Sequence, residues 1–186
     1  MSQNILSEAF IYDGGRSPFG RHAGALSPVR PDDLLAHVIK AVVNRNDFKA
    51  EDFEDVVMGN TNGAGEDCRN VARFALLEAG MPNTTAGITV NRLCGSGLAA
   101  TLDAARGVKV GEGDLFLSGG VESMSRAPIV MSKAHSAFDR GQTIADSTLG
   151  ARFTNPAYSK SFGDDTMPQT ADNIARDLGI SREESD

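Results

Sequence analysis

Apolar residues in the first 120 positions follow two alternating patterns. Short apolar runs at residues 56–58, 87–90 and 115–118 are typical of buried strands, and residues 9–12 predict a further strand near the N-terminus. Between these runs, apolar residues recur at the spacing of a helix with one buried face. Strands that alternate with helices predict an α/β fold, with a mostly parallel, mixed sheet covered by helices on both faces.

Three segments of this region are predicted to be helices. The first begins at Pro31, whose ring suits the first helical turn. Its apolar stripe comprises Leu34, Leu35, Val38, Ile39, Val42 and Val43. The second covers residues 68–79 and is closed by Gly80, and the third covers residues 98–106 and ends near Gly111.

The pattern changes from about residue 121. Ser, Met, Pro, Asp and Gly interrupt the periodicity until residues 170–178, which is too long for an ordinary connection. We therefore predict that residues 1–120 form the α/β unit and that residues 121–186 form a loop-rich insertion or lid. Ser181 and Glu184 have the spacing of a capping box, which begins a helix, yet the chain stops at Asp186. We expect the sequence to be a piece of a longer protein.

Cys94 lies at the junction between a predicted strand and an alanine-rich helix, in the segment NRLCGSG at residues 91–97. Unpaired backbone N–H groups and the helix dipole favour the thiolate there, which is the nucleophilic form. Gly95 and Gly97 leave room beside the sulfur for a bulky acyl group. A cysteine is nevertheless more often an inert, buried small hydrophobe. The Gly-x-Gly could also hold a phosphate, although it lacks the third glycine of a dinucleotide motif.

Composition and charge exclude several classes of protein. The net charge of −7 disfavours binding to nucleic acid or to anionic membranes, and no apolar run approaches the length of a membrane span. Two cysteines, Cys68 and Cys94, make no disulfide framework and fit a reducing cytoplasm. The three histidines are widely spaced and lack a cysteine cluster, so we expect no metal site.

Two other candidates have simpler interpretations than a functional one. Cys68 lies on the second predicted helix, whose apolar face makes it a packing residue rather than a reactive thiol. Arg69 and Arg73 could bind an anionic group, although an ion pair or a subunit contact is the simpler interpretation.

Several segments together resemble the thiolase family, the coenzyme A-dependent acyltransferases that make or cleave β-ketoacyl thioesters. They are residues 16–20 (RSPFG), 65–73 (GEDCRNVAR), 90–98 (VNRLCGSGL) and 119–128 (GGVESMSRAP), followed by a similar tail at residues 167–183. The motifs occur in order over essentially the whole chain. Their wording is most similar to the degradative 3-ketoacyl-CoA and β-ketoadipyl-CoA thiolases, the acetyl-CoA acyltransferases of fatty acid or aromatic degradation.

The resemblance implies two related βαβ-rich halves, with a loop domain inserted in the first. Residues 1–120 correspond to the N-terminal half, and residues 121–186 to the beginning of the coenzyme A-binding loop domain. Cys94 corresponds to the nucleophile that carries the acyl group as a thioester, and its backbone N–H to an oxyanion donor. Met167 corresponds to the coenzyme A contact region, although the residue before it is Thr166 where biosynthetic members have histidine. Its alternative is an ordinary gap-filling methionine.

Three motifs of the family are absent from the sequence. They are the Gly-His-Pro that carries the activating histidine, the Cys-x-Gly that carries the second cysteine, and Asn-Glu-Ala-Phe. We therefore expect this chain to be inactive alone, with coenzyme A or acyl-CoA as substrate, no covalently bound cofactor, and a homodimer or homotetramer as the assembly. The alternative is a non-catalytic coenzyme A-binding or structural half that acts through a partner. A ketoacyl synthase is disfavoured by the wording Cys-Gly-Ser-Gly.

Overall fold

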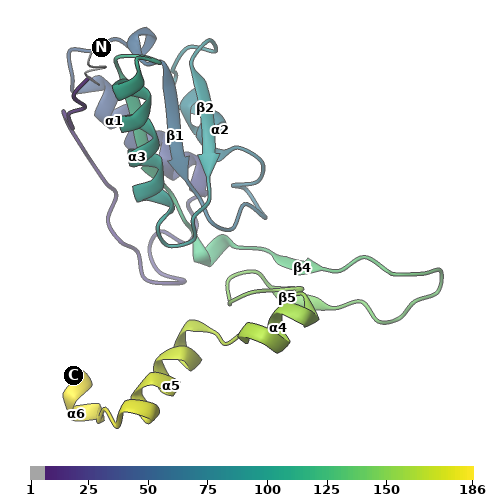
Figure 1. The fold of residues 1–186 in the computed structure, drawn as a ribbon. Helices are drawn as coiled ribbons and strands as arrows, with labels where there is room; N and C mark the ends of the chain where they lie inside the picture. Colours follow the sequence, from purple (N-terminus) through teal and green to yellow (C-terminus); the bar gives the residue numbers. More distant parts are fainter. Residues whose placement is uncertain (1–6) are drawn as a thin grey trace, which may run out of the picture. The chain divides into compact units, whose positions relative to one another are not determined.

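The computed structural model describes residues 7–186, which divide into two compact units with the boundary between Arg126 and Ala127. At the centre of the first unit is a parallel sheet (Figure 1). Strand β1 (Asp55–Gly59) lies between β2 (Ala86–Val90) and β3 (Phe116–Gly120), and both neighbours run parallel to it. The α/β fold with a mostly parallel sheet is thus confirmed.

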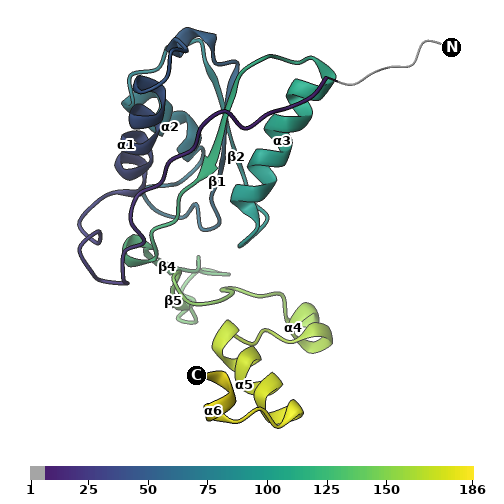
Figure 2. The same cartoon turned by 90° about the vertical axis from the view of Figure 1, so that its left-hand side faces the viewer.

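Helices cover both faces of this sheet, as the alternating pattern predicts. Helices α1 (Pro31–Asn44) and α2 (Val71–Glu78) lie on one side, and α3 (Ser96–Val110) lies on the other (Figure 2). A short 3-10 turn, η1 (Ala50–Asp52), leads from α1 into β1. Helix α3 ends where predicted, because Gly111 adopts the left-handed conformation that closes a helix.

The main hydrophobic core lies between α1, α2 and β1. Leu76, Val56 and Val71 are its largest fully buried side chains. The predicted stripe on α1 is buried along its centre and half-buried along its edges. Leu35, Ile39 and Val43 make up the centre, and Leu34, Val38 and Val42 the edges. Burial of one side of a helix in this way is what seats α1 against the rest of the unit.

The predicted first strand at residues 9–12 is wrong. Residues 7–20 have no regular secondary structure, and Phe10 and Ile11 are each 83% exposed. A cavity of about 180 Å³ lies between residues 9–13 and the β3 residues 116–118. No ladder of hydrogen bonds, the feature that defines a strand in a sheet, joins the segment to β3.

Helix α2 begins three residues later than predicted. Arg69 has a left-handed backbone (φ 65°), which interrupts a helix. The Asn70 side chain then caps α2 by accepting a hydrogen bond from the Arg73 N–H (3.2 Å). Cys68 therefore lies in the turn before α2 and is exposed, so its predicted role as a packing residue is wrong.

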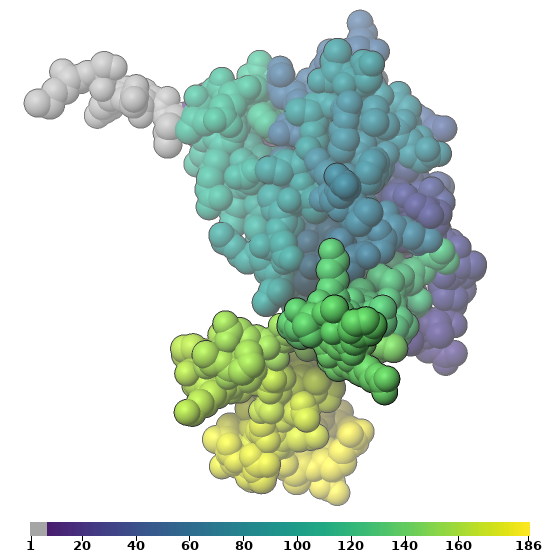
Figure 3. All heavy atoms as spheres, turned by 90° about the vertical axis from the view of Figure 1, so that its right-hand side faces the viewer, coloured from purple at the N-terminus to yellow at the C-terminus, as the bar shows by residue number. Residues whose placement is uncertain are grey.

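The second unit contains one small hairpin and three short helices. Strands β4 (Ile129–Met131) and β5 (Ile144–Asp146) are antiparallel and follow the 3-10 turn η2 (Met124–Arg126) of the first unit. The helices are α4 (Pro156–Phe162), α5 (Met167–Leu178) and α6 (Arg182–Ser185), and the atoms of the last two are the yellow spheres in Figure 3. Within residues 127–186 Ser147 alone is buried, so this unit encloses no hydrophobic core.

Capping boxes begin the last two helices. The Ser181 hydroxyl accepts from the Glu184 N–H (3.2 Å) while the Glu184 carboxylate accepts from the Ser181 N–H (2.8 Å), as the sequence predicts. Thr166 and Gln169 form the same arrangement at α5. Paired caps satisfy backbone groups that helices of this length otherwise leave to water.

Replacing Gly59 by alanine is expected to destabilise the first unit by about 1–3 kcal/mol, because overpacking forces the surrounding backbone to move. A Cβ at Gly59 would lie 2.4 Å from the Ser96 carbonyl carbon and 2.5 Å from the Gly97 nitrogen. The measurement is the free energy of unfolding in urea. Gly14→Ala is the matched control, since a Cβ at that position meets no atom within 4 Å. Equal urea midpoints for the two variants would contradict the prediction.

Candidate active site

The carboxyl ends of the three strands form the candidate site. Gly59 at the end of β1 is in register with Val90 of β2 and Gly120 of β3, so the three strands end at one level. Ligands of open parallel sheets bind at such ends, because the loops that leave the strands converge there. The loop that leaves β2 contains Cys94.

Cys94 lies in a tight turn before α3 rather than in the first turn of the helix. Gly95 is the N-cap and Ser96 is the first helical residue, so Cys94 stands one position ahead of the cap. Leu93 has a left-handed backbone with φ 48°, which is uncommon for a residue with a branched side chain. Cys94 is exposed, so its thiol is accessible to a ligand.

Hydrogen bonds within the turn hold the left-handed conformation of Leu93. The hydroxyl of the buried Ser96 accepts from the Arg92 N–H (2.8 Å) and donates to the Leu93 carbonyl oxygen (2.5 Å). The Gly95 N–H donates to the Arg92 carbonyl oxygen, and the Ser96 N–H to that of Leu93, both at 3.0 Å. The Asn91 side chain accepts from the Leu93 N–H (2.9 Å). Strain of this kind persists only where several contacts enforce it.

Backbone donors remain available around the thiol. Within residues 7–186, the N–H groups of Gly97 and Leu98 have no described acceptor, as is usual at the start of a helix. A Cβ at Gly97 would meet only the Gly119 carbonyl oxygen, at 3.8 Å, so this side of the helix start is open. Unpaired N–H groups beside open space suit an anion, including the oxyanion of an acyl-transfer intermediate.

Residues just beyond β1 and β3 hold the same turn in place through hydrogen bonds. The Thr61 hydroxyl donates to the Leu93 carbonyl oxygen (3.2 Å), and the Thr61 carbonyl oxygen accepts from the Asn91 amide (2.9 Å). The Glu122 carboxylate, just beyond β3, accepts from the backbone N–H groups of Thr61 (2.8 Å) and Asn62 (3.2 Å). Three loops are thus joined by direct hydrogen bonds around Cys94.

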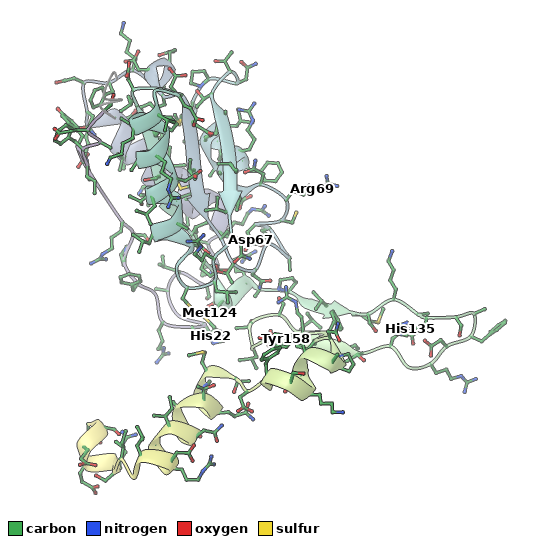
Figure 4. The ribbon with its side chains drawn as sticks, viewed as in Figure 1. His22, Asp67, Arg69, Met124, His135 and Tyr158 are labelled. Atoms are coloured by element: carbon green, nitrogen blue, oxygen red, sulfur yellow. The ribbon has the colours of Figure 1, made fainter. Side chains whose placement is uncertain are left out.

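The buried side-chain amide of Asn60 also joins the ends of β1 and β3. The Asn60 amide nitrogen donates to the Asp67 carboxylate (3.1 Å) and to the Val121 carbonyl oxygen (3.0 Å), and both side chains are buried. Asp67 also accepts from the Gly65 N–H (3.1 Å) and lies near the ends of the strands in Figure 4. Buried polar groups with satisfied partners fix one arrangement of a loop.

An ion-pair cluster forms around Glu66, the residue before Asp67 in the loop after β1. The Glu66 carboxylate accepts two hydrogen bonds of 2.5 Å from the Arg126 guanidinium and one of 3.2 Å from Arg30. Arg30 in turn pairs with Asp32 (2.7 Å). The hydrogen bonds from Arg126 are the main cause that lowers the pKa of Glu66, with a further contribution from the positive charge of Arg30.

Comparison with known proteins shows the family of this chain. The family model described as the N-terminal domain of thiolase matches residues 9–186. The chain belongs to the thiolase family. Cys94 and the loops around it therefore occupy the N-terminal domain of a thiolase.

The most similar relatives among those found are thiolases that are longer than this chain. The 3-oxoadipyl-CoA/3-oxo-5,6-dehydrosuberyl-CoA thiolase of Escherichia coli (strain K12) is 56% identical over 182 residues, which are 97% of this chain and 45% of that protein. The β-ketoadipyl-CoA thiolase of Pseudomonas aeruginosa is 54% identical, over 96% of this chain and 45% of the relative. The chain spans less than half the length of either thiolase.

A solved structure gives the thiolase fold directly. The crystal structure of the Bacillus anthracis acetyl-CoA acetyltransferase superposes with a TM-score of 0.83 at 31% identity, over 97% of this chain and 44% of the other. The thiolase-like half expected from the motifs is thus confirmed as the fold of this chain.

The structure assigns the other sequence candidates to different places. Met167 is the first residue of α5 in the second unit and is 75% exposed. Arg73 donates to the carbonyl oxygens of Thr85 (2.5 Å) and Asn83 (2.8 Å), so it holds a loop of its own chain in place rather than forming an ion pair.

None of the helices described for residues 7–186 is long and apolar enough to cross a membrane. No group of three or more potential metal ligands occurs within the same residues.

Sequence reasoning assigned no role to Thr61, Glu122 or Ser96. Their positions after strands were visible, because each follows a predicted strand by a few residues. Their hydrogen bonds were not, because Thr61 and Glu122 are 61 positions apart and only the folded sheet brings their loops together.

The Glu66 ion pair predicts a pH-dependent contribution to stability. Because folding lowers the pKa of Glu66, the contribution is fully present above the pH at which an ordinary glutamate titrates, and it is lost as the pH falls through the lowered value. Glu66→Gln is expected to reduce the free energy of unfolding by about 1 kcal/mol at neutral pH, since the pair is partly exposed. Urea unfolding from pH 7 to pH 3 measures this, and a difference that stays constant in acid would show the prediction to be wrong.

Proposed function

We propose that this chain supplies the nucleophile of a thiolase, with Cys94 taking an acyl group from a β-ketoacyl-CoA and passing it to coenzyme A. The observation that carries the proposal is the exposed Cys94 in a strained turn, beside backbone N–H groups that have no described acceptor. Membership of the thiolase family supports the reaction class.

The proposed reaction has two acyl transfers. The Cys94 sulfur attacks the β-carbonyl carbon, an S–C bond forms, and the bond between the α and β carbons breaks. The electron pair of that bond leaves on the α-carbon of an acyl-CoA, which takes a proton. The sulfur of free coenzyme A then attacks the thioester and releases Cys94. The unpaired N–H groups at the start of α3 suit the oxyanion formed in each transfer, and we propose the N–H of Cys94 as a further donor.

We propose that the 186 residues alone do not turn over. Rapid transfer needs a group that moves a proton, at the α-carbon in the first step and at the coenzyme A thiol in the second, whereas a single slow acylation of Cys94 can take its proton from water. The Gly-His-Pro and Cys-x-Gly motifs that carry such groups in the family are absent from this sequence. The proposed activity is therefore that of a protein in which these groups accompany Cys94.

We propose a degradative substrate of the 3-oxoadipyl-CoA kind. The support is the sequence identity of 52–56% to several thiolases whose names specify 3-oxoadipyl- or β-ketoadipyl-CoA. We further propose that residues 121–186 begin the loop domain that binds coenzyme A, with Met167 as a contact. The exposure of Met167 at the first turn of α5 supports this role. A cytoplasmic homodimer or homotetramer is the proposed assembly.

Incubation of the chain with acetoacetyl-CoA is expected to leave an acetyl group on Cys94 and none on Cys68. Both thiols are exposed, so Cys68 is an internal control for accessibility. Peptide mass spectrometry measures the adduct, which Cys94→Ser should abolish and Cys68→Ser should retain. Equal labelling of both cysteines, or thiolysis at the rate of a full-length relative, would overturn the proposal. A folded chain without any adduct would favour the non-catalytic alternative.

The isolated chain is expected to associate in solution. Leu98 and Leu102 on α3 are 67% and 43% exposed, and contiguous exposed apolar surface promotes association. Light scattering should give a mass above that of a monomer, and replacing both leucines by glutamine should lower it. A monodisperse wild-type monomer that unfolds cooperatively would contradict this expectation.

A further inference from the structure

We infer that Glu122 is a positioning residue for Cys94, acting through Thr61 on the turn that carries the thiol. The inference deepens the proposed function, since it concerns the geometry of the proposed nucleophile. Glu122 follows β3 by two residues, whereas Cys94 follows β2, so the two belong to different loops of the same sheet edge.

The turn around Cys94 has two separate requirements. Its own shape includes the left-handed Leu93 and is fixed by bonds among residues 91–96. The second requirement is that the turn keeps its position relative to the sheet. Hydrogen bonds within the turn cannot fix that position, so contacts to other segments must fix it.

Thr61 supplies two such contacts. Its hydroxyl donates to the Leu93 carbonyl oxygen (3.2 Å), on the residue directly before Cys94. Its carbonyl oxygen accepts from the Asn91 amide (2.9 Å), and the same Asn91 side chain accepts from the Leu93 N–H (2.9 Å). Both ends of the left-handed residue are therefore bound, directly or through Asn91, to Thr61.

Glu122 fixes Thr61 in turn. One carboxylate oxygen accepts from the Thr61 N–H (2.8 Å) and the other from the Asn62 N–H (3.2 Å). Hydrogen bonds to an ionised carboxylate are stronger than those between neutral groups. The carboxylate thus joins the loop after β1 to the end of β3, and the loop after β1 holds the Cys94 turn.

The position of the start of α3 does not depend on the hydrogen bonds of Glu122 and Thr61. Ser96 and Gly97 lie against Gly59, where a Cβ would meet them at 2.4–2.5 Å. Changing Glu122 should therefore leave α3 on the sheet and loosen only the turn before it. This separation makes the inference testable in a chain that still folds.

Hydrogen exchange in three variants tests the inference. Glu122→Ala removes both acceptors, Glu122→Gln keeps one carbonyl oxygen, and Thr61→Val removes only the hydroxyl that binds Leu93. The alanine and valine variants are expected to speed hydrogen exchange at the bonded amides of Leu93, Gly95 and Ser96 about tenfold, which corresponds to the free energy of one hydrogen bond. The glutamine variant should speed exchange less. Amides of β1 should not change.

Asp139→Asn is the matched control. The Asp139 carboxylate also accepts from two backbone N–H groups, those of His135 and Gly141, but it lies in the second unit. This variant should leave exchange at residues 93–96 unchanged. Iodoacetamide provides the second measurement, because the ratio of the reaction rates at Cys94 and Cys68 should change when Glu122 is replaced and stay the same in Asp139→Asn.

The outcomes separate the inference from the proposed function. Faster exchange confined to residues 93–96 supports the positioning role even if wild-type Cys94 proves no more reactive than Cys68, a result that would count against the proposed function alone. Unchanged exchange at residues 93–96 in folded Glu122→Ala overturns the inference. So does a uniform increase that includes β1, since that is the signature of a general structural role.

Discussion

The close contact between the end of β1 and the start of α3 is the constraint on which the rest of the site depends. Gly59 has no side chain, and this allows the backbone of Ser96 and Gly97 to lie directly against it. A Cβ at Gly120 would likewise meet the Gly59 carbonyl oxygen at 2.8 Å. The absence of a side chain at Gly59 lets the start of α3 lie directly against the end of β1, and the Cys94 turn lies beside that contact.

Convergence of strand ends leaves many backbone groups that need partners. The structure meets this need with side chains rather than with more secondary structure. Glu122 accepts two N–H groups, and Asn60 joins a carboxylate to a carbonyl oxygen. Across the described residues, every buried side-chain nitrogen and oxygen has a hydrogen-bond partner. Fully satisfied polar contacts of this kind specify one loop arrangement and hold a strained residue such as Leu93.

The two units differ in how they are stabilised. The first encloses a core between α1, α2 and β1, whereas residues 127–186 bury only Ser147 and rely on hairpin pairing and helix caps. Helix α5 keeps Ile174 and Leu178 at least half exposed. Local capping can begin a helix, but burial of an apolar face supplies most helical stability in proteins. The Bacillus anthracis acetyl-CoA acetyltransferase that superposes on this chain is more than twice as long.

The sequence by itself determined the secondary structure wherever its signal was local. The apolar stripe of α1, the strands at residues 55–59 and 86–90, the glycine that ends α3 and the capping box at Ser181 all depend on neighbouring residues, and each was predicted. The ordered motifs likewise identified the thiolase family, because a set of such segments is specific even without a fold.

Tertiary structure decided what depends on residues far apart in the chain. Residues 9–12 have the composition of a strand but pair with no strand of the described sheet, and no local rule reports the absence of a ladder partner. Cys68 is exposed because Arg69 turns left-handed before α2. The link from Glu122 through Thr61 to Leu93 joins loops about 30 and 60 positions apart, because hydrogen bonding depends on distance in space and not on distance in sequence.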